Sequence, residues 1–326
     1  MNKTNDLVIN SCPVCQSSDC ISFIKTKAQL YHSNDVFNFD QCKRCKFVFL
    51  NPRVPEYKLN QYYNSYYLPY RGASAWGKYR FFVERSLKKL DAKKIYRLKK
   101  HHDIKPSSLI LDIGCGKPSF VKAIQEKFEA KALGIDFSDK GWKNNKEFSN
   151  LNLKVAEIKD LEHNLNPDVI TMWHYLEHDY FPLKNLKHLK KISKPTTKLI
   201  IEIPNFDSYT RLKFSENWAG WHTPRHTSLF SPDNIKLLLN RSGWQVIKLD
   251  TFGTMDAYNL QWMSKMEEKN IDWSKNMEDE FMAYILGMIK FYPKKLNEKK
   301  SSLGIMTIVA EPSLCSRKPP NPNQSL

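Results

Sequence analysis

Four cysteines near the N-terminus have the residue type and the spacing of a metal site. Two Cys-x-x-Cys pairs, with 26 residues between them, are formed by Cys12, Cys15, Cys42 and Cys45. Such pairs can supply four thiolates to one tetrahedral zinc ion, and a shell of four thiolates leaves no open position for a substrate. The sequence therefore predicts a structural zinc, with metal-free reduced dithiols as the alternative. Cys20 lies outside this spacing and is expected to be a free thiol.

A second stretch with chemical potential reads LILDIGCGK and covers residues 109–117. Its apolar start suits a buried parallel strand, Asp112 stands near the carboxyl end, and Gly114 and Gly116 let the backbone turn tightly against a ligand. A further acid, Asp136, follows 24 positions after Asp112 at the end of the next apolar run. A carboxylate at that place can bind a ribose diol, so the two motifs together predict a nucleotide site.

The elements that must position these residues alternate between strands and helices. Strands are predicted at 109–113, 130–136, 153–155, 167–173, 197–203, 244–249 and 303–310. Helices are predicted at 76–102, 118–129, 139–148, 181–192 and 232–241. This alternation predicts an α/β fold with a doubly wound, Rossmann-like, mostly parallel seven-stranded sheet, preceded by a small zinc-ribbon domain. Ligands are expected at the carboxyl ends of the first, second and fourth strands.

The remaining segments complete a predicted domain organisation. It comprises a zinc ribbon at 1–50, a tyrosine-rich linker and helical cover at 51–104, the core at 105–254, a helical insertion at 255–300, the last strand at 301–312 and a disordered tail at 313–326. The tyrosines between Tyr57 and Tyr70 are expected to pack between domains, with stacking on a substrate as the alternative. For the insertion, core packing, a lid, a contact between subunits and a membrane-facing surface all remain open.

Composition sets the broad class of the protein. The chain has 326 residues, a net charge of +17 and a hydrophobic fraction of 41%, which suits a globular protein with a substantial core. Lysines are spread along the whole chain, so a lysine-rich surface is the first interpretation, with a phosphate-bearing substrate, nucleic acid or an anionic membrane as alternatives. The start of the chain lacks the pattern of a signal peptide, and no apolar run is long enough for a transmembrane span. A cytoplasmic protein is expected.

Several motifs, in this order along the chain, resemble those of class I S-adenosylmethionine-dependent methyltransferases. They are LDIGCG at 111–116, GID at 134–136, VAEIKDL at 155–161, DVITMWHYLEH at 168–178 and IEIPN at 201–205. PRHTSLFS at 224–231 and SGW at 242–244 also resemble a small-molecule branch that is similar to the ubiquinone O-methyltransferases. Some members of that group have a similar N-terminus, with a zinc ribbon followed by Asn-Pro and a tyrosine-rich stretch.

The resemblance implies that S-adenosylmethionine is the cofactor and assigns residues to it. The implied contacts are Asp112, Gly114, Cys115 and Gly116 at the turn around the methionine moiety, Asp136 at the ribose, Glu157 and Ile158 at the adenine, and Trp173 and His174 on the methionine side. Lys117-Pro118 departs from the family pattern, which often has a third small residue there. Pro118 suits a first helical turn but removes one N–H donor, and Lys117 is expected to supply positive charge near the cofactor carboxylate. Weak cofactor binding is the alternative.

Methyl transfer from a sulfonium is an in-line displacement, so the protein mainly has to align the acceptor with the methyl group. A base is required only when the acceptor carries a poorly acidic proton, and His178, His226 and His174 are the candidates, with hydrogen bonds that fix loops as the alternative. The predicted function is methyl transfer to oxygen, nitrogen or carbon of a small molecule. An acidic acceptor, for which Arg225 is a candidate ligand, and a homo-oligomer remain open. An RNA methyltransferase and a non-catalytic binding module are the alternative functions.

Overall fold

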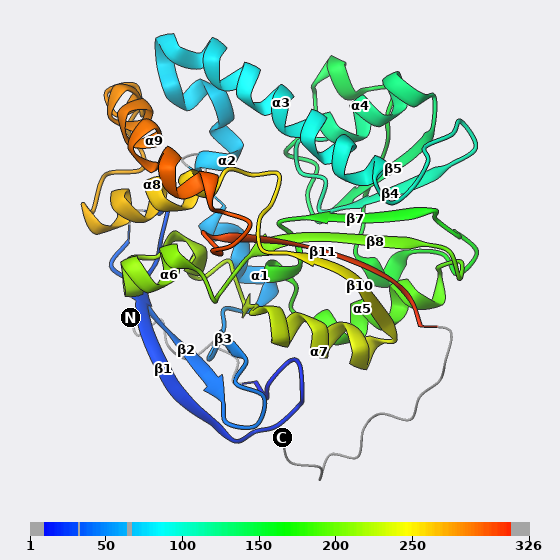
Figure 1. Cartoon of the computed structure of the whole chain (residues 1–326), viewed down its shortest axis with the longest axis horizontal. Helices are drawn as coiled ribbons and strands as arrows, with labels where there is room; N and C mark the ends of the chain where they lie inside the picture. The colour runs from blue at the N-terminus through cyan, green and yellow to red at the C-terminus, as the bar shows by residue number, and fades with distance from the viewer. Residues whose placement is uncertain (1–9, 32, 64–66, 314–326) are drawn as a thin grey trace.

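A seven-stranded sheet forms the centre of the computed structural model, which describes residues 10–31, 33–63 and 67–313 (Figure 1). Its strand order is β10-β11-β8-β7-β4-β5-β6. The bounds are β4 (Leu109–Ile113), β5 (Lys131–Asp136), β6 (Asn152–Val155), β7 (Val169–Trp173), β8 (Lys198–Pro204), β10 (Trp244–Asp250) and β11 (Ile305–Pro312). Strand β11 runs antiparallel to both β8 and β10, whereas the pairings among β4 to β8 are parallel. The predicted Rossmann-like, mostly parallel sheet is therefore confirmed.

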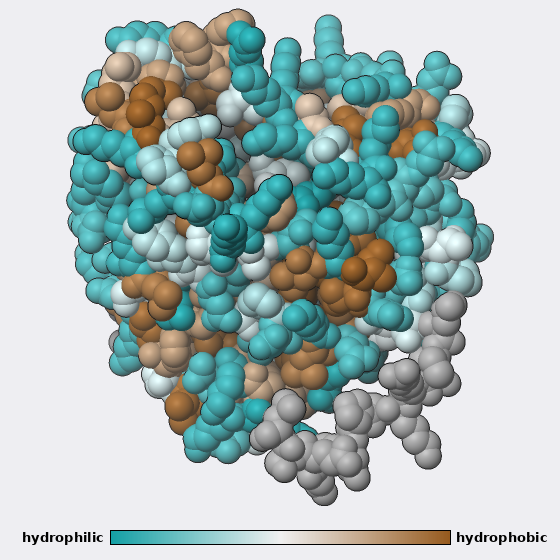
Figure 2. Space-filling view, viewed as in Figure 1, coloured by the Kyte–Doolittle hydropathy of each residue, from teal (hydrophilic) through white to brown (hydrophobic). Residues whose placement is uncertain are grey.

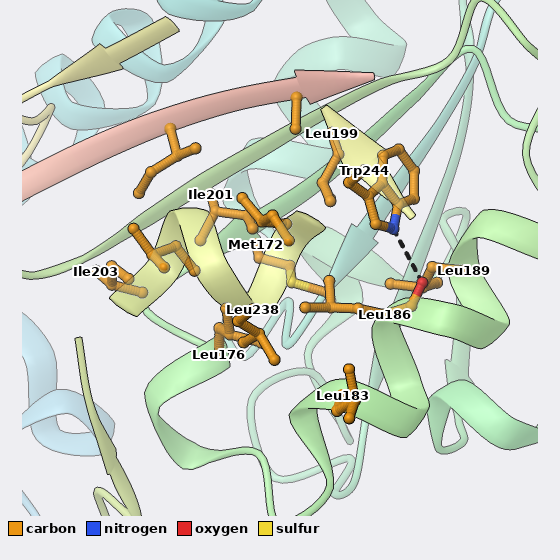
Figure 3. Packing of buried hydrophobic residues seen from close by; sticks show 14 of the residues in the cluster. Met172, Leu176, Leu183, Leu186, Leu189, Leu199, Ile201, Ile203, Leu238 and Trp244 are labelled. Carbon is orange, nitrogen blue, oxygen red and sulfur yellow. Dashed lines mark hydrogen bonds between the residues drawn. The ribbon is translucent and has the colours of Figure 1, made fainter. Parts of the chain in front are cut away.

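Helices cover both faces of this sheet (Figure 1). Helices α3 (Arg80–Lys99) and α4 (Ser119–Phe128) lie on one face, and α5 (Pro182–Lys191) and α7 (Pro232–Ser242) lie on the other. Side chains alternate along a strand, so in β4 Ile110 packs toward α3 and α4 whereas Leu111 packs toward α5 and α7. Figure 3 shows the second of these layers, where Trp244 Nε1 donates a hydrogen bond of 2.9 Å to the Leu186 carbonyl.

The N-terminal region forms a second, smaller sheet. It contains β1 (Cys20–Lys27), β2 (Val36–Cys42) and β3 (Val48–Leu50), all antiparallel. The fourth strand, β9 (Ser228–Leu229), comes from the loop that follows β8 and pairs with β3. The rings of Phe47 and Phe230 lie 5.1 Å apart at the same junction. This N-terminal sheet, called the cysteine ribbon below, is thus attached to the core by both backbone pairing and aromatic packing.

Residues 255–300 form two helices, α8 (Ala257–Glu268) and α9 (Phe281–Leu296). Their inner side chains, Trp262, Trp273 and Phe281, are buried against Trp76 and its neighbours. The outer face of α9 exposes apolar side chains, and an apolar patch lies over this helix at the upper left of Figure 2. Short helices elsewhere are α1 (Glu56–Leu59), α2 (Leu68–Arg71) and α6 (Tyr209–Phe214). Among the described residues, no helix is both long and apolar enough to cross a bilayer.

Two predicted helices differ from the structure. The segment 139–148 forms turns and a short 3-10 helix, Lys146–Phe148, because Asn144 adopts a left-handed φ of 62° and Gly141 packs tightly against the backbone of Gly116. The helix predicted over 76–102 begins later, at Arg80, after a 3-10 segment that is kinked at a glycine. The predicted tail, from residue 314 onward, lies outside the described residues.

Candidate active site

The turn after β4 is fastened to the end of β5 by backbone hydrogen bonds. Gly114 and Cys115 both donate to the Ile135 carbonyl, at 2.9 and 3.0 Å. The next N–H, that of Gly116, donates to Asp136 Oδ2 at 2.9 Å. Both glycines adopt left-handed φ values, 72° at Gly114 and 48° at Gly116, which other residues adopt only with strain. The sequence motif therefore folds into a tight turn directly beside the acidic residue.

Space around this turn is closed on two sides and open on a third. A β-carbon on Gly114 would lie 2.4 Å from the ring of Tyr175, and one on Gly141 would lie 2.1 Å from the Gly116 carbonyl oxygen. A β-carbon on Gly116 would meet no atom within 4 Å. The open side gives a ligand close access to the backbone, as the predicted cofactor requires.

The two aspartates of the motifs have different surroundings. Asp136 accepts hydrogen bonds from Gly116 and, at 3.2 Å, from the Ser138 N–H, while burial raises its pKa. Asp112 is only 4% exposed and accepts a 2.6 Å hydrogen bond from the Thr171 hydroxyl inside the sheet. Burial raises the pKa of Asp112 to about 6. Asp136 is therefore bound to the glycine turn at the end of β5, whereas Asp112 is bound inside the sheet.

The other predicted cofactor residues differ in their exposure. Cys115 is buried and its sulfur packs beside Gly134. Lys117 is exposed, immediately before α4. Ile158 is buried in the core, while the exposed Glu157 side chain pairs with Lys159 at 2.7 Å.

Trp173 ends β7 and has an unused hydrogen-bond donor. Its ring packs edge-on against Phe120 with centroids 5.7 Å apart. Its indole nitrogen is buried and has no hydrogen-bond partner among the described residues. A buried donor without a partner costs stability, and a bound ligand could accept from it.

Three histidines from two distant segments gather beyond the ends of β7 and β8. His178 lies in a 3-10 turn after β7, and His222 and His226 lie in the loop after β8. Ring centroids lie 4.5 Å apart for His178 and His226, and 4.7 Å apart for His222 and His226. Burial lowers the pKa of all three, so they are neutral at pH 7. The structure thus brings together the predicted His178 and His226.

His174 forms a charged cluster beside these rings. Its ring nitrogens lie 3.4 Å from Glu177 Oε1 and 3.4 Å from Glu202 Oε1. Burial alone would lower its pKa, but the two carboxylates raise the pKa of His174 to about 9. Glu202 also accepts hydrogen bonds from the backbone N–H groups of Thr254 and Met255. Burial alone would raise the pKa of Glu202, but His174 and these donors lower it to about 2.

The tyrosine-rich segment covers the site. Tyr63 OH lies 3.2 Å from His178 Nδ1, and Tyr67 OH lies 2.8 Å from His222 Nε2. Tyr63 also packs against Phe137, which directly follows Asp136, with ring centroids 5.6 Å apart. The segment therefore packs against the histidines and connects them to the acidic end of β5.

Arg225 is committed to internal contacts. It is fully buried, one guanidinium N–H donates to the Tyr62 carbonyl at 2.7 Å, and another donates to the Gln29 carbonyl. It also lies over the ring of Tyr67, 4.7 Å from the centroid. Arg225 therefore joins the ribbon, the tyrosine segment and the histidine loop, which leaves an acidic acceptor without this predicted ligand.

The four predicted metal ligands also come together. The sulfurs of Cys12, Cys15, Cys42 and Cys45 lie within 4.8 Å of one another. The Cys12–Cys45 and Cys15–Cys42 sulfur distances are 3.5 and 3.4 Å. Four convergent cysteine sulfurs fit a tetrahedral zinc ion. Cys20 Sγ instead donates to the Ser17 carbonyl, outside this group.

Several residues of the site were not singled out from the sequence. Glu177 directly precedes His178, and this Glu-His pair next to His174 was the available signal. The hydrogen bonds of Tyr63 and Tyr67 with histidines more than a hundred residues away left no local pattern.

The strand order and the glycine turn with its acidic partner define a class I, Rossmann-like methyltransferase fold. A sequence model of the methyltransferase domain family matches residues 73–249. The chain belongs to this family and is a methyltransferase.

Solved structures with a similar fold include an S-adenosylmethionine-dependent methyltransferase from Archaeoglobus fulgidus, with 19% identity and a TM-score of 0.46 over 72% of this chain and 97% of that one. A putative sarcosine dimethylglycine methyltransferase from Galdieria sulphuraria has 13% identity and a TM-score of 0.49 over 71% and 88% of the two chains. A comparison with curated protein sequences gave no significant match.

Proposed function

We propose that this methyltransferase transfers the methyl group of S-adenosylmethionine to a small molecule, at a site between the glycine turn and the histidines. The observation that carries the proposal is the tyrosine segment, since Tyr63 contacts both Phe137 at the cofactor side and His178 at the other side. A site covered in this way favours a small acceptor over an extended polymer.

In this proposal the cofactor is held mainly by backbone and by one carboxylate. The Gly114–Gly116 turn lies against the methionine moiety, Asp136 accepts hydrogen bonds from the ribose hydroxyls, and Ile158 with the backbone of Glu157 borders the adenine. The open space beside Gly116 and the unpartnered indole N–H of Trp173 support this fit. Once bound, the cofactor supplies an electrophilic methyl group.

The histidines supply the remaining chemistry. Because a carbonyl oxygen can only accept a hydrogen bond, the contacts of His178 Nδ1 with Arg225 O and of His226 Nδ1 with Gly220 O place a hydrogen on each Nδ1. The Nε2 atom of each ring then keeps its lone pair and can accept a proton from the acceptor. Tyr63 and Arg225 orient these rings, and His174 stays protonated between its two carboxylates.

We further propose that residues 1–50 form a zinc ribbon that holds the site closed. The ribbon sheet is completed by β9, which lies between the histidine loop and α7, and Asn234 of α7 donates to the Cys45 carbonyl at 2.8 Å. Four reduced thiols suit a cytoplasmic location. The helical insertion at 255–300 packs on this assembly, and the exposed face of α9 is a candidate surface for a homo-oligomer.

The proposal is tested by calorimetry with S-adenosylhomocysteine, followed by transfer of a labelled methyl group into fractionated metabolite extracts. The expected results are binding of S-adenosylhomocysteine and label in a small-molecule fraction. Label in the RNA fraction alone would contradict the assignment of the acceptor. Absence of S-adenosylhomocysteine binding would contradict the assignment of the site.

One observation favours RNA as a second candidate acceptor. A groove of about 530 Å³ lies between the cysteine ribbon and α5 and is lined by Arg53, Lys184, Lys187 and Lys191. The three lysines are exposed on one helix and can neutralise phosphates. If RNA is the acceptor, the wild type shifts the electrophoretic mobility of bulk RNA in a salt-dependent way, and changing these lysines to glutamate abolishes the shift. A small-molecule enzyme causes no such mobility shift.

A further inference from the structure

The carboxylate of Glu177 is buried without adequate partners. The residue is 2% exposed, and neither carboxylate oxygen has a hydrogen-bond partner among the described residues. His174 Nδ1 lies 3.4 Å and His226 Nε2 lies 4.0 Å from Oε1. Burying an ionised carboxylate is costly unless a charge or a set of donors compensates it. A cation bound beside this carboxylate would supply that compensation.

His178 and His226 can each offer a ring nitrogen to an ion beside Glu177. Each donates its Nδ1 hydrogen to a backbone carbonyl, His178 to Arg225 O at 3.1 Å and His226 to Gly220 O at 2.8 Å. This bond fixes the tautomer and leaves Nε2 as the basic nitrogen. The same arrangement is typical of histidines that bind metal ions, because the outer hydrogen bond orients the ring.

The three side chains converge closely enough to share one ion. One ligand atom from each of Glu177, His178 and His226 lies within 4.8 Å of the other two. Ligands bound at about 2.1 Å lie within about 4.2 Å of each other across the ion, so only small side-chain movements are required.

The surroundings of Glu177 also suit a cation. Glu177 and Glu202 lie on two sides of the His174 ring, each 3.4 Å from one of its nitrogens. The guanidinium of Arg225 is directed elsewhere, to the carbonyls of Tyr62 and Gln29. A divalent ion beside Glu177 would compensate a buried carboxylate that lacks hydrogen-bond donors.

We propose that Glu177, His178 and His226 bind a divalent first-row transition metal ion. Two imidazoles and one carboxylate suit Zn²⁺, Co²⁺, Mn²⁺ or Fe²⁺, and three protein ligands leave positions open for an oxygen atom of a bound molecule. The inference rests on the proposed function only in assigning that oxygen to the methyl acceptor. The ion then binds and polarises the acceptor, in place of proton removal by a free histidine.

The test uses the full-length protein, stripped of metal and then loaded with Co²⁺. Thiolate ligands of the cysteine ribbon give intense charge-transfer absorption, whereas a site of two histidines and one glutamate gives only weak ligand-field bands. The expected result is a second Co²⁺ equivalent without added thiolate absorption. Glu177→Gln, which keeps the size of the side chain, is expected to weaken this second site by more than about a hundredfold and to leave the thiolate absorption intact.

His178→Gln serves as a second variant, on a less buried ligand. His188→Gln serves as the control, because His188 lies on α5 and its ring bonds to the Leu161 carbonyl, outside the proposed site. Retention of the second equivalent in Glu177→Gln or in His178→Gln would overturn the proposal, as would its absence from the wild type. S-adenosylhomocysteine binding is measured on the same samples. Binding of S-adenosylhomocysteine without the second metal refutes this inference alone. Binding of the second metal without S-adenosylhomocysteine binding refutes the proposed function alone.

Discussion

Asp136 Oδ2 accepts a hydrogen bond of 2.9 Å from the Gly116 N–H, which joins the acid at the end of β5 to the glycine turn after β4. The bond links two motifs that are 20 residues apart in sequence. It aims the carboxylate along the open side of the turn and fixes the turn itself. Both consequences can be tested with one substitution.

Asp136→Asn is expected to weaken S-adenosylhomocysteine binding by about ten- to a hundredfold. Hydrogen bonds to a charged group contribute about 1.5–3 kcal/mol, and the amide can no longer accept through both oxygens. Calorimetry measures the change. Asp233→Asn is the matched control, because the Asp233 side chain is 95% exposed on α7. Equal affinities for the two variants would rule out the ribose role of Asp136.

Lys117→Ala is expected to weaken S-adenosylhomocysteine binding by only about two- to fivefold, and by a smaller factor at high salt. The Lys117 side chain is exposed, so its attraction to the cofactor carboxylate is screened by water and is worth under about 1 kcal/mol. Lys131→Ala, at the opposite end of β5, is the control. An unchanged affinity at low salt would show that Lys117 does not compensate for the N–H that Pro118 lacks.

The sequence was most informative where a local pattern determines structure. Short apolar runs that alternate with helical patterns predicted the sheet, and the Cys-x-x-Cys pairs and the LDIGCG turn were each found within a few neighbouring residues. Contacts between distant segments could not be predicted in this way. The pairing of β3 with β9, the anchoring of Arg225 to Gln29 and Tyr62, and the meeting of His178 with His226 depend on tertiary packing. The helix expected over 139–148 failed for the same reason, since its conformation follows the contact of Gly141 with Gly116.

Cys42→Ser is expected to abolish the zinc bound by thiolates and to expose the ribbon to proteolysis. Cys42 is fully buried beside Cys15, and structural zinc contributes directly to folding. A thiol-reactive mercurial releases thiolate-bound zinc, which a chelating dye then quantifies. Cys20→Ser is the control and should retain the metal. Loss of zinc from both variants, or from neither, would contradict the assigned ligand set.

Asp112→Asn is expected to become increasingly favourable for stability as the pH rises. Burial raises the pKa of Asp112 from 3.8 to about 6, so the folded state holds this proton more tightly than the unfolded chain does. The stabilisation from protonation is complete below pH 3.8 and is lost as the pH rises through about 6. Asparagine stays neutral and can still accept from the Thr171 hydroxyl. The difference in unfolding free energy between Asp112→Asn and the wild type should therefore shift toward the variant by about 2–3 kcal/mol between about pH 4 and pH 8. Urea denaturation at several pH values measures it, and a difference that does not change with pH would show that Asp112 is not held protonated by burial.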